Sequence, residues 1–301
     1  MDPLRPASVE ELKTLIQLYK QRLPESIQFV SLLQNILRTN TTLSESDKQR
    51  ISHRLRKTVY VPNKEDCNQF ATFIAVSCEE VKIIYKHKIT LRISCVMTIA
   101  YFQDPFILPN TLEDPPTELT IALQQTTYIN WNLKPVFTIG PNSDIRARLT
   151  EIIAEHKLPL ESRSDCINFW MPKEEAAKLN PVVPNDVELK PLRFQHGKLI
   201  NEWWPYRYPS SQRYFESAIE HYGGFGLFDK TSQELVACVF QNDHDAVGSK
   251  LNNFFTATYT QFLIEPTGVM EVHLLKLCLN ILRTNTIKMS ILSSQMIMHV
   301  Q

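Results

Sequence analysis

The chain has 301 residues, enough for two domains of ordinary size, and 43% of them are hydrophobic, which is enough to build a core in each. Its 32 lysines and arginines balance its 32 aspartates and glutamates, so no net field draws the protein to nucleic acid or to an anionic membrane. We therefore expect no nucleic-acid partner.

The cysteines and the first residues indicate an intracellular protein. The six cysteines lie far apart without a CxxC pair, as is typical of reduced thiols. The opening MDPLRPASVEEL is too acidic for a signal or transit peptide. The longest apolar run, 89–102, is too short for a bilayer and contains Arg92, so we expect a buried strand there and no membrane span.

Helices and strands alternate along the first part of the chain. Ser8, with Glu10 and Glu11 after it, predicts the start of a helix that continues to Lys20, and apolar spacing predicts a second helix over 26–39. Strand-like runs follow at 58–61, 70–76, 82–85 and 89–102. The patterns then predict a helix over 114–126, a strand over 136–139, a helix over 143–156 capped by Ser143 or Asp144, and a strand over 166–171.

The segment KLNPVVPND favours a domain boundary. Its prolines, Pro181 and Pro184, cannot continue a helix or a central strand. The boundary divides the chain into 1–180 and 181–301, although the same prolines also fit a rigid turn within one domain. Because helices and strands interleave on both sides, we expect a mixed α/β fold in which each half carries its own sheet.

The second half opens with the clearest local pattern in the chain. A strand is predicted over 187–191, followed by helices over 195–203 and 210–221. Glycines at 223, 224 and 226 end the second helix and begin a strand over 225–228. A polar turn over 229–233 and a strand over 234–241 complete an antiparallel hairpin.

Segments of this region carry a family resemblance. They are LINEWWPYR (199–207), SQRYF (211–215), GLFDK (226–230) and LVACV (235–239). These residues resemble the glycine N-acyltransferase-like family of the GNAT superfamily, especially its insect members. The segments 3–29 and 126–140 resemble the N-terminal half of that family, so the likeness covers most of residues 3–243.

The resemblance implies a fold and a reaction. The fold is α/β with a mixed sheet and two GNAT-like domains in tandem, a degenerate one over 1–180 and an acyl-CoA domain over 181–301. The second domain diverges after about residue 243, where the last strands of the family cannot be recognised. The reaction is transfer of an acyl group from acyl-CoA, the co-substrate, to the amine of a small acceptor such as glycine. The compartment expected is the cytoplasm or the mitochondrion.

The family binds the CoA diphosphate at a strand-to-helix turn of the pattern Arg/Gln-x-x-Gly-x-Gly/Ala. Backbone N–H groups at a helix N-terminus reach phosphates closely only where side chains are absent. Counted from Pro266, Val269 takes the place of the Arg and Val272 that of the first Gly, while Gly268 is out of phase. An ordinary strand-to-helix connection therefore stays an alternative. The cofactor-binding residues predicted here are Phe262, Leu263, Ile264 and Gly268.

Acyl transfer also needs a base for the attacking amine and a donor for the thioester oxygen. The acidic and imidazole groups available after the hairpin are His244, Asp245 and Glu265, which we predict as catalytic residues. The sequence NDHD also fits a solvated turn. A bulge in the strand at 262–264 would turn a backbone N–H toward the thioester oxygen.

An aromatic cluster follows the first helix of the second half. We predict that it walls an acyl pocket and that its arginine pairs with an acceptor carboxylate, because guanidinium binds carboxylate in a bidentate manner. The alternative is a helix end that packs onto the sheet. The residues concerned are Trp203, Trp204, Tyr206 and Arg207. The eight histidines show no pair at ligand spacing, so we expect no metal site.

Two functions stay open on this sequence. The first is an acyl-CoA-dependent N-acyltransferase. The second is a catalytically silent GNAT-like binding or scaffold protein that lacks a working CoA diphosphate loop. A slot between splayed strands near Phe262 would favour the first function, and a filled slot would favour the second.

Overall fold

The structure is a computed structural model. It describes residues 1–44, 46, 57–64, 69–77, 81–89, 92–100, 105–133, 135–140, 142–171, 185–204, 207, 211–241, 246–251, 261–264 and 290–300. Of the strands β4, β5, β12, β13 and β14, and of β8 after Leu160, only the backbone is described.

The first half of the chain contributes most of the helices. Its elements are β1 (Leu4–Pro6), α1 (Val9–Lys20), α2 (Ile27–Thr42), β2 (Thr58–Pro62), β3 (Phe73–Ser77), β4 (Val81–Ile89), β5 (Arg92–Ala100), β6 (Phe106–Asn110), α4 (Thr117–Gln125), the 3-10 turn η2 (Trp131–Leu133), β7 (Val136–Ile139), α5 (Ser143–Glu155) and β8 (Leu160–Met171). The second half contributes β9 (Val187–Pro191), α7 (His196–Trp203), α8 (Ser211–Tyr222), β10 (Gly224–Asp229), β11 (Leu235–Gln241), β12 (Ala246–Leu251), β13 (Gln261–Ile264) and β14 (Ser290–Val300).

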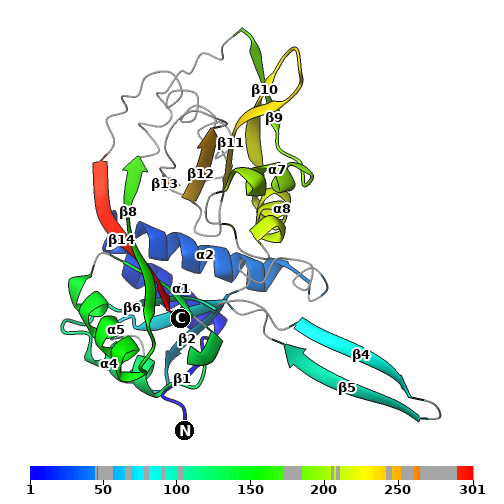
Figure 1. Cartoon of the computed structure of the whole chain (residues 1–301). Helices are drawn as coiled ribbons and strands as arrows, with labels where there is room; N and C mark the ends of the chain where they lie inside the picture. The colour runs from blue at the N-terminus through cyan, green and yellow to red at the C-terminus, as the bar shows by residue number, and fades with distance from the viewer. Residues whose placement is uncertain are drawn as a thin grey trace.

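The fold is mixed α/β with two units in tandem, as predicted, but the two units share one sheet. Twelve strands follow the order β1-β2-β3-β6-β7-β14-β8-β13-β12-β11-β10-β9. The expectation of one sheet for each half is wrong, because β8 of the first half pairs in parallel with β13 of the second. In addition, β14 lies between β7 and β8 and runs antiparallel to both. Figure 1 shows β14 beside β8. Of the predicted boundary segment, 178–186, residues 178–184 with both prolines lie outside the described residues.

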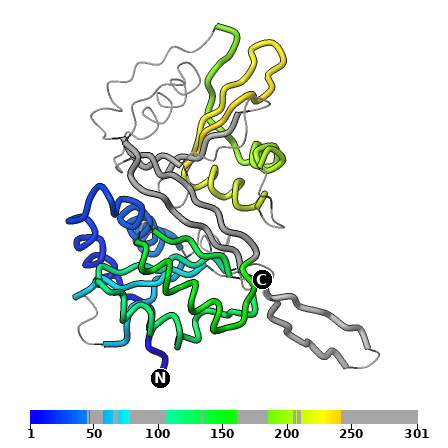
Figure 2. Tube along the Cα trace, turned by 60° about the vertical axis from the view of Figure 1, so that its left-hand side comes forward, coloured from blue at the N-terminus to red at the C-terminus, as the bar shows by residue number. Residues whose placement is uncertain are grey.

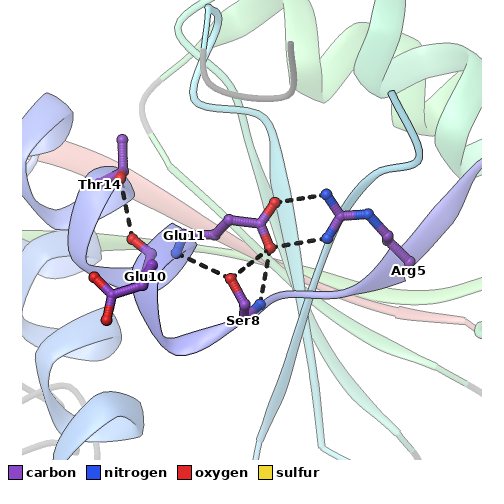
Figure 3. A network of polar contacts seen from close by, with 5 residues as sticks. All are labelled: Arg5, Ser8, Glu10, Glu11 and Thr14. Atoms are coloured by element: carbon purple, nitrogen blue, oxygen red, sulfur yellow. Dashed lines mark hydrogen bonds and ion pairs between the residues drawn. The ribbon is translucent and has the colours of Figure 1, made fainter. Parts of the chain in front are cut away.

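The start of α1 confirms the helix start that the sequence predicts at Ser8. The Ser8 hydroxyl accepts the Glu11 backbone N–H at 3.2 Å, and the Glu11 carboxylate accepts the Ser8 N–H at 2.9 Å, which makes a capping box. The same carboxylate binds Arg5 of β1 through two nitrogens, at 2.6 and 2.8 Å (Figure 3). One glutamate therefore caps the helix and joins it to the edge strand.

The first half is built in three layers. Alternate residues of its strands point to opposite faces, as the pleat requires. On one face Ile74, Ile107 and Phe137 pack with α4 and α5, and on the other Phe73, Ala75 and Leu108 pack with α1 and α2. Figure 2 shows α1 and α2 in blue on the opposite side of these strands from the green helices.

One local prediction in the first half needs correction, and another is met in part. The cap of α5 is Asn142, whose side chain accepts the N–H groups of Asp144 and Ile145, and not Ser143 or Asp144. Three cap-forming residues stand in a row here, so sequence alone does not select among them. The run expected as a buried strand, 89–102, is largely the strand β5, which in the described part of the chain pairs with β4 in a separate two-stranded sheet, and the burial of its side chains stays a prediction (Figure 1).

The predicted hairpin of the second half is confirmed. Strand β10 pairs antiparallel with β11 and, on its other side, with β9. Gly223 ends α8 with φ +79°, a left-handed conformation that glycine adopts without strain. The helices α7 and α8 cover one face of this hairpin, and their contact depends on Gly197, where a Cβ atom would lie 2.8 Å from the Glu216 nitrogen.

The two halves begin with the same order of elements. Among the described elements of each half, a strand is followed by two helices and then by two strands: β1, α1, α2, β2 and β3 in the first half, and β9, α7, α8, β10 and β11 in the second. In each, the first strand pairs antiparallel with the strand that follows the two helices. The next two strands also form an antiparallel pair. The tandem character is therefore visible in topology as well as in chain order.

Among the helices that the structure describes, none has the length and apolar character needed to cross a membrane.

Candidate functional site

The structure describes only some of the predicted site residues. Trp203, Trp204 and Arg207 are described with their side chains, and Phe262, Leu263 and Ile264 are described as the backbone of β13. The remaining predicted residues lie outside the described ranges: Tyr206, His244, Asp245, Glu265 and Gly268. Within those ranges, no group of three or more His, Cys, Asp and Glu residues gathers as a metal site would require.

The tryptophans at the end of α7 pack onto the core of the second half. Both are half-buried, and Trp204 meets Phe215 of α8 edge-on at 5.6 Å between ring centroids. Phe215 in turn meets Phe240 of β11 at 5.4 Å. Arg207 is exposed. The cluster thus forms a helix end packed on the sheet, and its further role as a pocket wall stays a prediction.

Strand β13 is paired along both edges. Phe262 lies opposite Val247 of β12 on one side and opposite Phe169 of β8 on the other. The register is unbroken in both ladders across Gln261–Leu263, and with β8 it continues to Ile264. The bulge expected in this strand is therefore not present in its four residues, and neither edge of β13 is open at Phe262.

A splayed pair of parallel strands occurs instead in the first half. Strands β6 and β7 pair only through Phe106 with Val136 and Ile107 with Phe137. Beyond these residues β6 continues to Asn110 beside β3 and β7 continues to Ile139, but no further pairing joins them in this described part of the sheet. The two strands therefore diverge toward their carboxyl ends.

Aromatic side chains cover the diverging strands on the side of α1 and α2. The Tyr19 hydroxyl donates to the Ala71 carbonyl at 2.9 Å and accepts the Asn110 amide at 2.9 Å. The Tyr19 ring lies 5.4 Å from that of Phe29 and 5.5 Å from that of Phe73. Burial raises the pKa of the Tyr19 phenol far above its usual range, against the opposing hydrogen bond from Asn110, so the group is neutral. Tyr19 therefore stabilises the packing of α1 on these strands through its two hydrogen bonds.

The helix that follows β6 has its N-terminus closed by a carboxylate. Glu113 accepts the Glu118 backbone N–H at 2.7 Å, and the Glu113 N–H donates to Thr111 Oγ1 at 3.1 Å. Helix N-termini attract anions because their N–H groups are unpaired and the helix dipole is positive there. At α4 the chain's own carboxylate occupies that position, and a phosphate would meet a like charge. An acid just before the Asp-Pro-Pro sequence was the signal for this arrangement.

The two halves also meet through α2 and α8. The Tyr222 hydroxyl donates to Asn35 Oδ1 at 2.9 Å, and the Arg38 guanidinium lies 5.8 Å from the centre of the Tyr222 ring. Leu43, just after α2, packs against the core of the second half. The sequence signal for this junction was a polar row on α2, Gln28, Ser31 and Asn35, at helical spacing within an otherwise apolar helix.

Comparisons with known proteins identify the fold of this chain. A model named Domain of unknown function (DUF5645) matches residues 3–88 and 75–152. A Drosophila protein, determined by X-ray crystallography in a structural genomics programme, is similar over 100% of this chain and 99% of its own, with 18% identity and a TM-score of 0.73. At that identity the likeness concerns the fold alone. No curated protein matches the sequence.

Proposed function

We propose that this protein is an acyl-CoA-dependent N-acyltransferase that transfers an acyl group to the amine of a small acceptor such as glycine. The observation that carries the proposal is the repeated order of strand, two helices and antiparallel strands, with the same pairing in both halves. This order fits the two GNAT-like domains that the resemblance at residues 187–243 implies. The proposed place of action is inside the cell, in the cytoplasm or the mitochondrion.

The second half is the better candidate for binding acyl-CoA. In the first half, Tyr19, Phe29 and Phe73 pack beside the diverging strands, and Glu113 occupies the N-terminus of α4. An anionic, elongated co-substrate would have to displace both. The proposed catalytic residues are His244, Asp245 and Glu265, and the proposed cofactor segment is 262–268.

Ligand-dependent stability tests this proposal directly. A ligand that binds only the native state raises its stability, by about 2.7 kcal/mol at one hundred times the dissociation constant. We expect acetyl-CoA or benzoyl-CoA to raise the melting temperature, and glycine to cause thiol release from the bound acyl-CoA. Protein that neither gains stability nor releases thiol contradicts the proposal.

Arg207 offers a sharper test of the acceptor site. Because its side chain is exposed, Arg207→Ala is expected to leave stability nearly unchanged and to raise KM for glycine by weakening the hold on the acceptor carboxylate. Lys198→Ala, which removes an exposed cation from α7, is the matched control. Equal KM values for the two variants would remove Arg207 from the site.

A second candidate function is a silent GNAT-like binding or scaffold protein. The observation that favours it is the pairing of β13 on both edges, because the slot expected near Phe262 is filled by β8. Under this alternative, CoA thioesters cause no thermal shift, and residues 187–241 serve as packing for a partner. Thiol release that depends on glycine would exclude it.

A further inference from the structure

Helix α2 is buried on two chemically different faces. Phe29, Leu33 and Ile36 pack into the core of the first half. Turned away from them is the polar row of Gln28, Ser31 and Asn35, whose residues are 4%, 0% and 1% exposed. Asn35, at one end of this row, accepts the Tyr222 hydroxyl of the second half, and Gln28, at the other end, lies beside Gly140 of the first half. A buried polar face needs partners for its hydrogen-bonding atoms.

Several atoms beside this row have no such partner. Of the buried side-chain atoms in the described residues, Ser31 Oγ, Gln34 Oε1 and Thr138 Oγ1 make no hydrogen bond. Ser31 and Gln34 are one turn apart on α2. Thr138 lies on β7, two residues before Gly140, where a Cβ atom would stand 2.6 Å from the Phe29 ring and 3.2 Å from the Gln28 amide nitrogen. Ser31 and Gln34 thus leave two unpaired atoms on adjacent turns of α2, and Thr138 leaves a third on β7.

We infer that this polar face of α2, with Ser31 and Gln34 at its centre, is a binding site for the secondary amide group of a small molecule. The Ser31 hydroxyl and the Gln34 amide oxygen are left unpaired there, and leaving buried polar atoms unpaired is unfavourable. Such atoms are retained where water, an ion or another bound molecule satisfies them.

The chemistry of the unpaired atoms selects the ligand class. The Gln34 oxygen can only accept, so it needs an N–H or O–H donor, while the Ser31 hydroxyl can donate to a carbonyl. A secondary amide carries one N–H and one C=O and no charge. An ion is a poor fit, because the unpaired groups of this face are neutral and a buried charge requires a counter-charge.

Two molecules connected with acyl transfer carry this group, and the choice of these probes rests on the proposed function. The pantetheine arm of CoA contains secondary amides, and an N-acylated amino acid contains one as its product amide. Pantetheine and N-acetylglycine are therefore the two probes, and glycine, which has no amide, is the control. A response to pantetheine alone assigns the face to the co-substrate, and a response to N-acetylglycine alone assigns it to the product.

The first experiment measures the variants without ligand. Ser31→Ala and Thr138→Val remove unpaired hydroxyls, so the melting temperature is expected to stay the same or to rise. Thr72→Val is the matched control, because the buried Thr72 hydroxyl is hydrogen-bonded to Thr111 at 2.8 Å and its loss lowers the melting temperature. If Ser31→Ala lowers the melting temperature as Thr72→Val does, ordered water already satisfies the hydroxyl and the inference is wrong.

The second experiment measures binding by calorimetry. At least one probe is expected to bind the wild-type protein, with affinity about fivefold to tenfold weaker in Ser31→Ala, as the loss of one hydrogen bond predicts. Thr72→Val should bind as the wild type does. No binding of either probe, or equal binding by wild type and Ser31→Ala, overturns the inference. Probe binding without glycine-dependent thiol release would defeat the proposed function and leave this site standing, and the reverse result would defeat this site alone.

Discussion

The two halves of the molecule use the same order of elements but hold their helices on the sheet by different means. In the first half, side chains make the attachment: Tyr19 is hydrogen-bonded to Ala71 and Asn110, and Glu11 joins α1 to β1 through Arg5. In the second half, apolar packing attaches α8 to the sheet through Phe215 and Phe240, and Gly197 lets α7 approach the backbone of α8.

This difference concerns the polar and apolar contacts that hold the helices of each half. In the first half, the Glu113 carboxylate already accepts the Glu118 N–H at the start of α4. In the second half, close packing at Gly197 brings α7 and α8 together, and the Ser211 hydroxyl of α8 donates a hydrogen bond to Asn201 Oδ1 of α7. The halves therefore differ in polar against apolar attachment of their helices, and in the first half the start of α4 is closed to an anion.

Removal of the central aromatic ring of each half gives the largest expected effect. Phe73→Ala and Phe215→Ala each empty a position that is at most 2% exposed, which costs about 3–5 kcal/mol. Because one sheet runs through both halves, each variant should lower a single melting transition in calorimetry. Two transitions, of which each variant moves only one, would show that the halves are independent in stability.

Gly197→Ala tests the packing of the second half by glycine. The added methyl group would lie 2.8 Å from the Glu216 nitrogen and 2.9 Å from its Cα, so α7 must move away from α8, at a cost of about 1–3 kcal/mol. Gly223→Ala is the control without a steric clash, since nothing lies within 4 Å of its Cβ position and only its φ of +79° opposes the change. Chemical denaturation measures both. A neutral Gly197→Ala would contradict the close approach.

Two tyrosine substitutions compare the interior of the first half with the junction between the two halves. Tyr19→Phe leaves the buried Asn110 amide and the Ala71 carbonyl without their partner, which costs about 1–3 kcal/mol. Tyr222→Phe removes the hydrogen bond to Asn35 from a half-buried ring and should cost about 1 kcal/mol. Urea unfolding of the two variants gives the order. A larger loss for Tyr222→Phe would make the junction the stronger attachment.

The smallest effect concerns the turn of the hairpin in the second half. The N–H groups of Ser232 and Thr231 bind the Asp229 carboxylate at 2.7 and 2.8 Å and hold its pKa below the ordinary value of 3.8. A carboxyl with a lowered pKa stabilises the fold above its unfolded pKa, and this stabilisation is lost as the pH falls through the lower, folded value. Melting curves from pH 6 to 2.5 should therefore show a small acid-dependent loss that Asp229→Asn lacks. Identical pH profiles would contradict the shift.

Local patterns in the sequence predicted most of the elements, and long-range pairing accounts for what they missed. Two local motifs could be recognised from the sequence because each acts within a few residues. They are the capping box at Ser8 and Glu11 and the glycines after α8. Strand β14 has its partners in β7 and β8, far earlier in the chain, and no local pattern specifies that choice. The expectation of two separate sheets failed for this reason.

The candidate site was predicted less completely than the fold. Trp203 and Trp204 were correctly placed at the end of a helix, but the sequence could not show that Trp204 packs on Phe215. The closing of α4 by Glu113 depends on a side chain that returns to its own helix, which composition does not reveal. The unpaired hydroxyl of Ser31 is visible only once the packing around α2 is known.

The position of β14 has a consequence for biosynthesis. Ribosomes release a chain from its N-terminus, so β7 and β8 are exposed long before β14 leaves the exit tunnel. Until then, each of these strands presents an edge that is open to pairing with another nascent chain. The first half can therefore complete its sheet only after β14 has been synthesised, and holding chaperones would have most to protect during that interval.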